Sequence, residues 1–436
     1  MRPNRIGLWL FLGSLLLYNV NMREISSADT MGTRLLPLAL IQELRLDLDS
    51  FFRDYPAGRP LPYWVQHVRG HYLSSYPILP ALMAAPVYLV PLSLFTGGSL
   101  ALVNVLAKLS ATVFAALSVL VVYLALRQLA RPPVAAAIAF VYAVGTSTWS
   151  VSSQGLWGHG PAQLFMAAGL YGVLRAEADR RAAIWTGIAA GLMVASRPTT
   201  GLPALAFMAY LGHRDWRQGA VSLLGFLAVT VPVTAHNLWY FGSVQGGYAQ
   251  LHATHALFHG VGGAWTPSVG AGLLGILVSP SRGLLVYSPV LAFALAGLIL
   301  SLRDAGPRRP FFAYMAAATG GSVVMLGTFA VWWGGHSFGP RLLTDVLPLL
   351  ALFLVPVWPR LETSRLLTAA FLLAFVLSIG VQVVGVFYYP SPRRVDWNWT
   401  PQNVDFAHER LWDWQDTQIL RLLRNGPRSP GFESVG

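Results

Sequence analysis

The sequence predicts an all-α polytopic membrane protein with about 11 transmembrane helices, on the evidence of its composition and its recurring apolar segments. Of the 436 residues, 55% are apolar and only 11% are charged, whereas a soluble domain carries about 25% charged residues. Apolar runs close to the roughly 20 residues that a spanning helix needs recur along the chain. We therefore expect one membrane domain over residues 1–389, followed by a short outer tail, 390–436.

The expected spans are apolar runs separated by short polar connections. The first follows Arg2 and Arg5, as a signal peptide would, but no small-x-small cleavage site comes after it, so we expect a retained helix. The eleven spans cover residues 5–22, 100–126, 133–150, 160–175, 182–196, 200–213, 219–240, 283–302, 311–332, 343–358 and 366–389.

Arginines set the expected orientation, because cytoplasmic loops carry an excess of basic residues. The short outside connections hold only Arg197 and Arg341. This pattern predicts a multi-pass protein of the cell (inner) membrane with a cytoplasmic N-terminus and a C-terminus on the periplasmic or extracellular side. Because the arginines lie in these loops, nucleic-acid binding is excluded as the reason for the net charge of +12. The inside loops contain Arg127, Arg131, Arg175, Arg180, Arg181, Arg214, Arg217, Arg303, Arg308, Arg309, Arg360 and Arg365.

A long outer loop, residues 23–99, follows the first span. Apolar residues from Leu35 to Leu44 recur in it at helical spacing, with Arg34 and Glu43 on other faces. This spacing predicts an ordered, amphipathic juxtamembrane helix that lies on the membrane surface.

Residues 78–95 in the same loop are also hydrophobic, but they are not expected to cross the membrane. If they did, every later loop would change sides and its arginines would face outside. Four prolines at the start of this segment or within it also weaken a regular helix. This segment and residues 268–278 are therefore expected at the outer interface, or dipping into it.

Charged side chains near the apolar layer are costly, and each is a functional candidate. Converging arginines suit a phosphate, since the guanidinium fork binds it bidentately. Two alternatives stay open: single arginines that reach lipid headgroups, and an Arg341–Asp345 pair one helical turn apart. The charged candidates, which cluster in the outer half, are Glu24, Asp29, Lys108, His159, Arg197, Arg282, Arg341 and Asp345.

Asp29 lies where the first helix leaves the membrane, and a carboxylate there suits a general base toward an acceptor. The alternative is a helix N-cap, and the two roles are not exclusive. His159 is expected to be a hydrogen-bonded histidine at a helix start, since no second histidine lies at ligand spacing. A metal site is weakly supported: the chain has no cysteine, and the histidines at 252, 255 and 259 have no glutamate companion. No cofactor is expected.

The run from Trp332 through Trp333 and His336 to Pro340 joins aromatic rings to closely spaced glycines just before Arg341. Interfacial anchoring explains the tryptophans. The glycines also allow a backbone to approach a ligand, and the rings offer apolar faces to a sugar or an isoprenoid.

In layout and short motifs the chain resembles the integral-membrane glycosyltransferases of the GT-C superfamily, in particular the bacterial relatives of aminoarabinose transferases and protein O-mannosyltransferases. The family's acidic pair after helix one is matched by Asp29 alone, between Ala28 and Thr30, which makes the family's metal dependence doubtful here. The family's Lys-Pro-Pro-like element is matched by Ser75-Tyr76-Pro77 without its lysine, and Arg197 takes the place of a phosphate contact.

The resemblance implies transfer of a sugar from a polyprenyl-phosphate-linked donor to a lipid, glycan or protein acceptor at the outer face. Asp29 would be the base of a single, inverting displacement, and Arg197, Arg282, Arg341 and Lys108 would bind the donor phosphate. The main rival is a polytopic transporter or lipid flippase, because polar residues in a bundle also mark a substrate path. A non-catalytic envelope scaffold is a third possibility.

Overall fold

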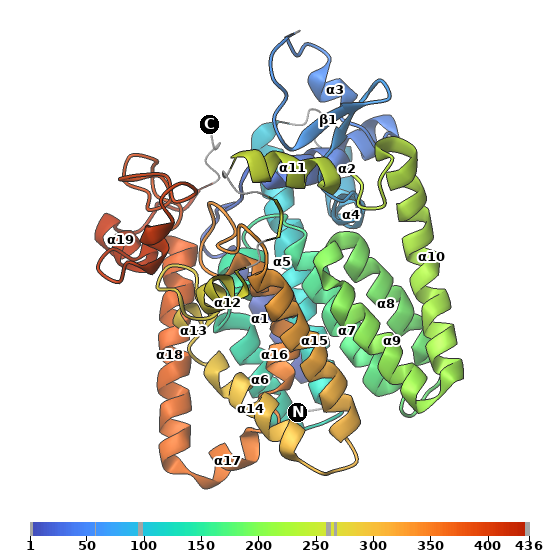
Figure 1. Ribbon diagram of the computed structural model, residues 1–436, viewed down its shortest axis with the longest axis vertical. Coiled ribbons are helices and arrows are strands. Elements are labelled where there is room, and N and C mark those ends of the chain that lie inside the picture. Colours follow the sequence, from blue (N-terminus) through green and yellow to red (C-terminus); the bar gives the residue numbers. More distant parts are fainter. Residues whose placement is uncertain (1–2, 57, 95–98, 259–262, 266–267, 432–436) are drawn as a thin grey trace.

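The computed structural model describes residues 3–56, 58–94, 99–258, 263–265 and 268–431. It is a bundle of helices that run along the long axis, with a small hairpin and short helices covering its upper end (Figure 1). The chain starts at the lower end with α1 (Pro3–Asn19), and the tail that follows α18 (Arg365–Phe387) lies at the upper end.

Helices occupy most of the predicted spans, so the prediction of a polytopic, mainly helical membrane fold is confirmed. Four helices are long and apolar enough to cross a membrane, namely α5 (Leu100–Leu126), α10 (Trp216–Phe241), α15 (Arg309–Gly327) and α18. The count of 11 crossings stays a prediction. The shorter helices at predicted spans are α1, α6 (Pro132–Val144), α7 (His159–Arg175), α8 (Ala182–Ser196), α9 (Gly201–Arg214) and α14 (Leu291–Arg303).

Three predicted spans differ from continuous helices. In the span expected at 133–150, α6 ends at Val144 and a π-helix (Thr148–Ser152) follows after a break. The span expected at 283–302 is interrupted: α13 (Leu284–Tyr287) ends before Pro289, whose missing N–H breaks the ladder, and α14 starts two residues later. The longest α-helix in the span expected at 343–358 is α16 (Leu347–Leu352), which is about 9 Å long. This segment traverses the bundle as a 3₁₀ turn (Arg341–Val346), α16 and α17 (Trp358–Thr363).

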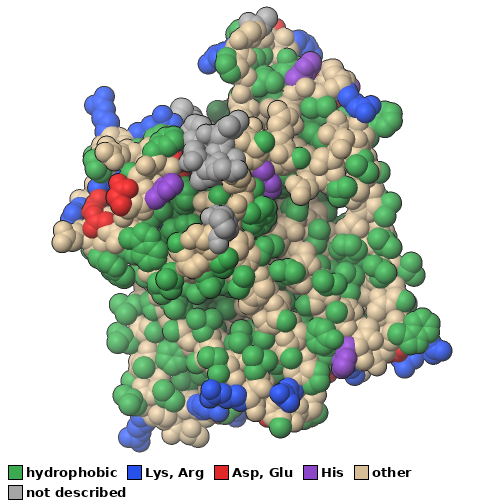
Figure 2. Space-filling model, viewed as in Figure 1, with side chains coloured by type: hydrophobic (Ala, Val, Ile, Leu, Met, Phe, Trp, Pro, Cys, Tyr) green, Lys and Arg blue, Asp and Glu red, His purple; other side chains and the backbone are tan. Residues whose placement is uncertain are grey.

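Basic loops meet at the lower end of the bundle. Arg131 and Glu362 form an ion pair of 2.5 Å, which joins the α5–α6 loop to α17. Arg308 donates to the Gln128 carbonyl at 3.3 Å. Figure 2 shows Lys and Arg side chains along this end, below a flank covered by hydrophobic side chains. Lys and Arg side chains also lie at the upper end in this view, and the orientation of the bundle in a membrane stays a prediction.

Glycines bring α8 and α10 into close contact. A Cβ added at Gly187 would lie 1.8 Å from the Ser222 carbonyl oxygen, and one at Gly225 would lie 2.4 Å from the Ile184 carbonyl oxygen. Larger side chains would separate these backbones, as in other membrane helix pairs built on small residues.

Helix α4 (Leu79–Leu94) corresponds to the hydrophobic segment that was not expected to cross. It packs against α2 (Met31–Glu43), and α5 then begins at the same, upper end (Figure 1). Helix α4 continues through Pro86 and Pro91, two of the prolines expected to weaken it. Its packing compensates for the lost hydrogen bonds: Tyr88, between those prolines, is fully buried.

The outer loop folds into α2, α3 (Asp49–Phe52) and an antiparallel hairpin of β1 (Val65–Val68) and β2 (His71–Ser74), which the sequence analysis missed. Arg69 and Gly70 both have positive φ, 53° and 82°, as a two-residue type I′ turn requires. Helix α11 (Tyr248–Phe258) lies alongside at the same end (Figure 1).

Helix α2 is not the surface helix that its spacing predicts. Residues 32–39 are all buried. Arg34, expected on a polar face, pairs inside the protein with Glu24 at 3.2 Å and donates to the Asn104 side chain at 2.8 Å. The hairpin and α4 cover α2, so its polar face contacts protein instead of water or headgroups.

We predict that Gly32→Ala destabilises the protein by about 1–3 kcal/mol, a typical cost of overpacking. The new Cβ would lie 2.3 Å from Ser74 Oγ and 2.8 Å from Ser74 Cβ. Thermal unfolding in nanodiscs measures the effect, and the double variant with Ser74→Gly should restore the midpoint. Gly201→Ala is the control, because no atom lies within 4 Å of its added Cβ. Equal midpoints for both single variants would contradict the prediction.

Candidate active site

An ion pair between Asp29 and Arg341 lies at the upper end of the bundle. Arg341 Nη1 donates to Asp29 Oδ2 at 2.8 Å, and the Tyr63 hydroxyl donates to Asp29 Oδ1 at 2.5 Å. Asp29 is not the helix cap considered as an alternative, because Ser27 caps this turn: Ser27 Oγ accepts from the Asp29 N–H. The Asp29 carboxylate faces Arg341 and Tyr63.

Tyr63 comes from the loop before β1 and was missed by the sequence analysis. Burial raises the pKa of its hydroxyl above the ordinary value, and the nearby Asp29 charge raises it further. Tyr63 therefore remains a phenol at neutral pH and donates a hydrogen bond to the carboxylate. Nothing in its local sequence marks it, since the contact with Asp29 spans 34 residues.

Arg341 has unused hydrogen-bonding capacity. Its Nη2 donates to the Gly334 carbonyl at 2.8 Å, and its guanidinium lies 4.6 Å from the ring centroid of Trp157, a cation–π contact. Its Nε is buried and has no acceptor among the residues that the structure describes. Since a guanidinium has five N–H donors, this arginine retains donors for a ligand oxygen.

A second polar cluster surrounds Asp345, which belongs to the same 3₁₀ turn as Arg341. Asp345 bonds His159 Nδ1 at 2.7 Å through Oδ1 and accepts from Arg197 Nε at 2.8 Å through Oδ2. The Arg341–Asp345 pairing considered from the spacing is therefore wrong, because this turn is not α-helical. His159 begins α7 and is hydrogen-bonded there, as expected.

Tyr76 and Tyr248 lie close to both clusters, with their ring centroids 5.7 Å apart. Burial raises the pKa of both hydroxyls, and the negative charge of Asp29 raises both further. Tyr76 was a candidate from its place before α4, whereas Tyr248 of α11 was missed. Together they add neutral hydroxyl groups to a site whose charged members are Asp29, Arg341 and the Asp345 cluster.

Arg282 does not join this group. All five of its N–H donors have neutral acceptors, and its side chain is buried. The guanidinium lies 5.1 Å from the ring centroid of Trp397 in the tail. The acceptors are the carbonyls of Ser281, Trp333 and Gly335 and the side chains of Asn398 and Gln418, at 2.6–3.1 Å.

Lys108 and Glu24 support the exit of α1. Lys108 Nζ donates to the Ser153 carbonyl at 3.0 Å and to Gln154 Oε1 at 2.7 Å. The Gln154 carbonyl accepts from the Ile25 N–H at 2.7 Å, which fixes the strand-like segment that leads to Asp29. Glu24 is occupied by Arg34, so neither residue faces the Asp29–Arg341 pair.

The glycine-rich loop before Arg341 is held by the tail. Gly334, Gly335 and Gly339 have positive φ, between 62° and 72°, which explains why glycine is needed there. Trp333 Nε1 donates to Asp405 at 2.8 Å, and His336 bonds Asn403 at 2.8 Å. Trp332 packs against Trp333 and Trp412. These aromatic side chains contact the tail, which includes α19 (Gln418–Asn425), instead of an open apolar surface.

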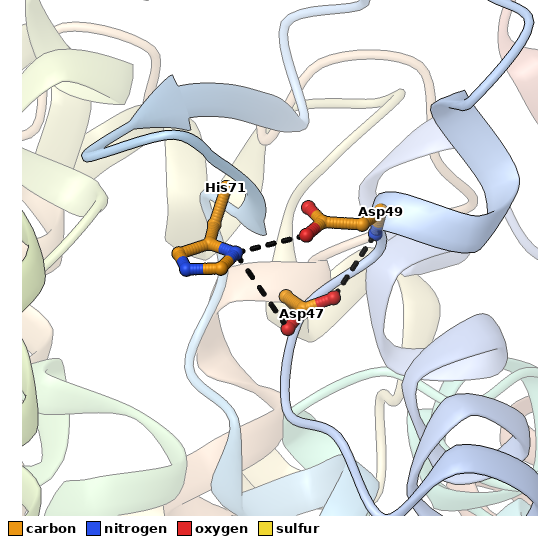
Figure 3. A group of neighbouring side chains, drawn as sticks. All are labelled: Asp47, Asp49 and His71. Carbon is orange, nitrogen blue, oxygen red and sulfur yellow. Dashed lines mark hydrogen bonds and ion pairs between the residues drawn. The ribbon is translucent and has the colours of Figure 1, made fainter.

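A group of three possible metal ligands, Asp47, Asp49 and His71, lies in the outer loop (Figure 3). His71 Nδ1 is 2.8 Å from Asp49, and Arg45 pairs with both carboxylates at 2.9 and 2.6 Å. Burial alone would raise the pKa of Asp49, but His71, the Tyr72 N–H and Arg45 outweigh it and lower that pKa. The positive charge of Arg45 would compete with a metal ion for these carboxylates. The ion pairs of this group instead connect α3 to β2.

The histidine triplet considered from its spacing lies partly outside the described residues. His252 lies on α11, with its ring 5.6 Å from that of Tyr248. His259 lies outside the described residues, and so does the side chain of His255.

No protein-family model matches the sequence, and no curated protein matches it significantly. Solved structures do resemble the fold. ArnT from Cupriavidus metallidurans bound to undecaprenyl phosphate matches with a TM-score of 0.55 and 15% identity, over 88% of this chain and 66% of that one. The archaeal oligosaccharyltransferase AglB from Archaeoglobus fulgidus, in complex with an inhibitory peptide and a dolichol-phosphate, matches with a TM-score of 0.53 and 14% identity, over 87% of this chain and 55% of that one.

A structure of the Archaeoglobus fulgidus oligosaccharyltransferase tethered with an acceptor peptide also matches, with a TM-score of 0.53 and 13% identity. It covers 86% of this chain, which spans about 55% of that enzyme. These likenesses confirm the resemblance at the level of the fold: the chain shares the fold of ArnT and of the archaeal oligosaccharyltransferase.

We predict that Arg282→Gln detaches the tail, because the shorter amide cannot replace five hydrogen bonds. Limited proteolysis in nanodiscs should then cleave residues 390–428 at least several-fold faster than in the unaltered protein. Arg394→Gln is the control, since Arg394 is exposed on the same tail. Equal cleavage of both variants would show that Arg282 does not anchor the tail.

Proposed function

We propose that this protein transfers a glycosyl group from a polyprenyl-phosphate-linked donor to an acceptor at the outer face of the membrane. The observation that carries the proposal is the Asp29–Arg341 pair, in which a base and a phosphate-binding group lie 2.8 Å apart on a GT-C fold. Both side chains are partly exposed, Arg341 to 14% and Asp29 to 16%, so a ligand can reach them.

In this proposal Arg341 binds the donor phosphate. Its Nη1 and Nη2 each donate once to the protein, so each keeps a second N–H for phosphate oxygens. The bond between the anomeric carbon and the phosphate oxygen breaks as the acceptor attacks, and the electron pair leaves with the polyprenyl phosphate. Arg341 stabilises the charge that develops on this leaving group.

Asp29 is the proposed general base. It accepts the proton of the acceptor hydroxyl or amine while the acceptor atom forms its bond to the anomeric carbon. One displacement at that carbon inverts its configuration. Tyr63 keeps the carboxylate oriented through Oδ1, and binding of a phosphate to Arg341 weakens the ion pair and makes Oδ2 available.

Arg197 is proposed as a second phosphate contact. Asp345 holds its Nε, which leaves the two Nη groups at the side chain's partly exposed end. His159 orients the same carboxylate from the other side. Arg282 and Lys108 are not included, because their donors are bonded to protein acceptors away from the Asp29–Arg341 pair.

We expect Asp29→Asn to abolish sugar release from a radiolabelled polyprenyl-phosphate donor while undecaprenyl phosphate still binds. Asparagine keeps the shape and the hydrogen bond from Tyr63 but cannot accept the proton. Asp54→Asn, on an exposed site of the same loop, should retain full activity. Full activity of Asp29→Asn would show that Asp29 is not the general base.

Arg341→Ala should weaken binding of undecaprenyl phosphate about 10–100-fold, the range for losing hydrogen bonds to a charged group. Arg197→Ala should weaken it less, because Asp345 holds the Arg197 Nε at 2.8 Å and only the two Nη groups are left for the phosphate. Binding to protein in nanodiscs is measured by native mass spectrometry, with Arg394→Ala as the control. If neither Arg341→Ala nor Arg197→Ala lowers the affinity, these arginines have no role in binding the donor.

A further inference from the structure

A cavity of about 360 Å³ lies between the outer loop and α11. One wall is formed by residues 61–67, which lead into β1, and the other by α11. Gln66 joins these walls, since its Nε2 donates to the Gly247 carbonyl at 2.9 Å and to Ser75 Oγ at 3.0 Å. The cavity is therefore built between two segments that are fixed to each other.

Tyr63 connects this cavity to Asp29. Its side chain lines the cavity and is 38% exposed, while its hydroxyl donates to Asp29 Oδ1. Arg341 does not line this cavity but lines a separate small hollow with Ile25 and Trp157. The carboxylate thus has the cavity on its Tyr63 side and the arginine on its other side.

The lining chemistry suits a neutral ligand with many hydroxyl groups. Four of its side chains end in an amide or a hydroxyl, one is an imidazole, and the described residues that line it include no Asp, Glu, Lys or Arg. The Tyr63 ring offers an apolar face to sugar C–H groups. The lining residues are Leu61, Pro62, Tyr63, Val65, Gln66, His67, Gln250, Leu251 and Thr254.

The volume of the cavity limits the size of the ligand. Pockets for small ligands occupy about 300–1,000 Å³, and this cavity lies near the small end of that range. It accommodates one or two sugar residues of a longer acceptor, with the remainder outside. A charged headgroup would find no opposite charge in the lining, and an apolar chain would cover the amide of Gln250 without offering it a hydrogen-bond partner.

We propose that this cavity is the acceptor site and that the acceptor is a carbohydrate whose attacking hydroxyl reaches Asp29 past Tyr63. This inference rests on the proposed function. Gln250 and Thr254 of α11 bind the sugar hydroxyls, and Gln66 keeps the walls together. The acceptor oxygen forms the bond to the anomeric carbon, its proton passes to Asp29, and the donor phosphate leaves on the Arg341 side.

The test uses the full chain in nanodiscs and a panel of methyl hexosides, observed by saturation-transfer NMR. At least one hexoside should bind, and the double variant Gln250→Leu/Thr254→Val should weaken it about tenfold, as expected for two lost hydrogen bonds. Gln245→Leu is the matched control, because Gln245 is exposed just before α11 and does not line the cavity. Thermal unfolding confirms that each variant is folded.

Three results would overturn the carbohydrate assignment: no hexoside binds, a hexoside binds equally well to the double variant, or a Ser- or Asn-containing peptide binds instead and is weakened by that variant. These outcomes are separate from failure of the transferase. Binding of undecaprenyl phosphate and the activity of Asp29→Asn test the donor side, while the Gln250 variants leave Arg341 and Asp29 unchanged.

Discussion

The Asp29–Arg341 ion pair joins two parts of the chain that are 312 residues apart, and the upper end of the bundle is organised around it. An ion pair at low exposure is favourable only if the geometry is good and the remaining polar atoms have partners. Tyr63 and the Gly334 carbonyl provide such partners on the two sides. The exception is the Arg341 Nε, which is buried and has no acceptor among the described residues.

Each partner of this pair depends on a buried cation that has only neutral acceptors in contact. Lys108 fixes Gln154, which holds the segment leading to Asp29. Arg282 binds the carbonyls of the glycine-rich loop on one side and the tail on the other, and so fixes the loop that leads to Arg341. Burying these charges costs desolvation free energy, and the hydrogen bonds that the two side chains make offset this cost. Both were candidates for phosphate binding from charge and depth alone, yet both position the backbone.

The sequence could predict features that depend on local pattern. The bounds expected for α5 and α8 agree with the structure, because hydropathy and flanking residues determine them. Features that depend on contacts between distant segments could not be predicted. The burial of α2, for example, requires the hairpin and α4, which pack against it. The hairpin itself was missed although the signal for its Arg69–Gly70 turn is local. Likewise, the four-residue spacing of Arg341 and Asp345 favoured a pair that the 3₁₀ turn prevents.

The distribution of polar contacts also bears on the transporter alternative. A transporter needs a path through the bundle, and polar residues would mark it. Directly below Asp345 the chain continues through Leu347–Leu354, where Leu350, Phe353 and the other side chains are buried in the main hydrophobic core. The polar site is thus closed toward the lower end at this segment. A site that is closed at this segment is suited to a lipid-linked donor and an acceptor that meet from the same side, which is the arrangement that the cavity beside Tyr63 and the arginine beside Asp29 require.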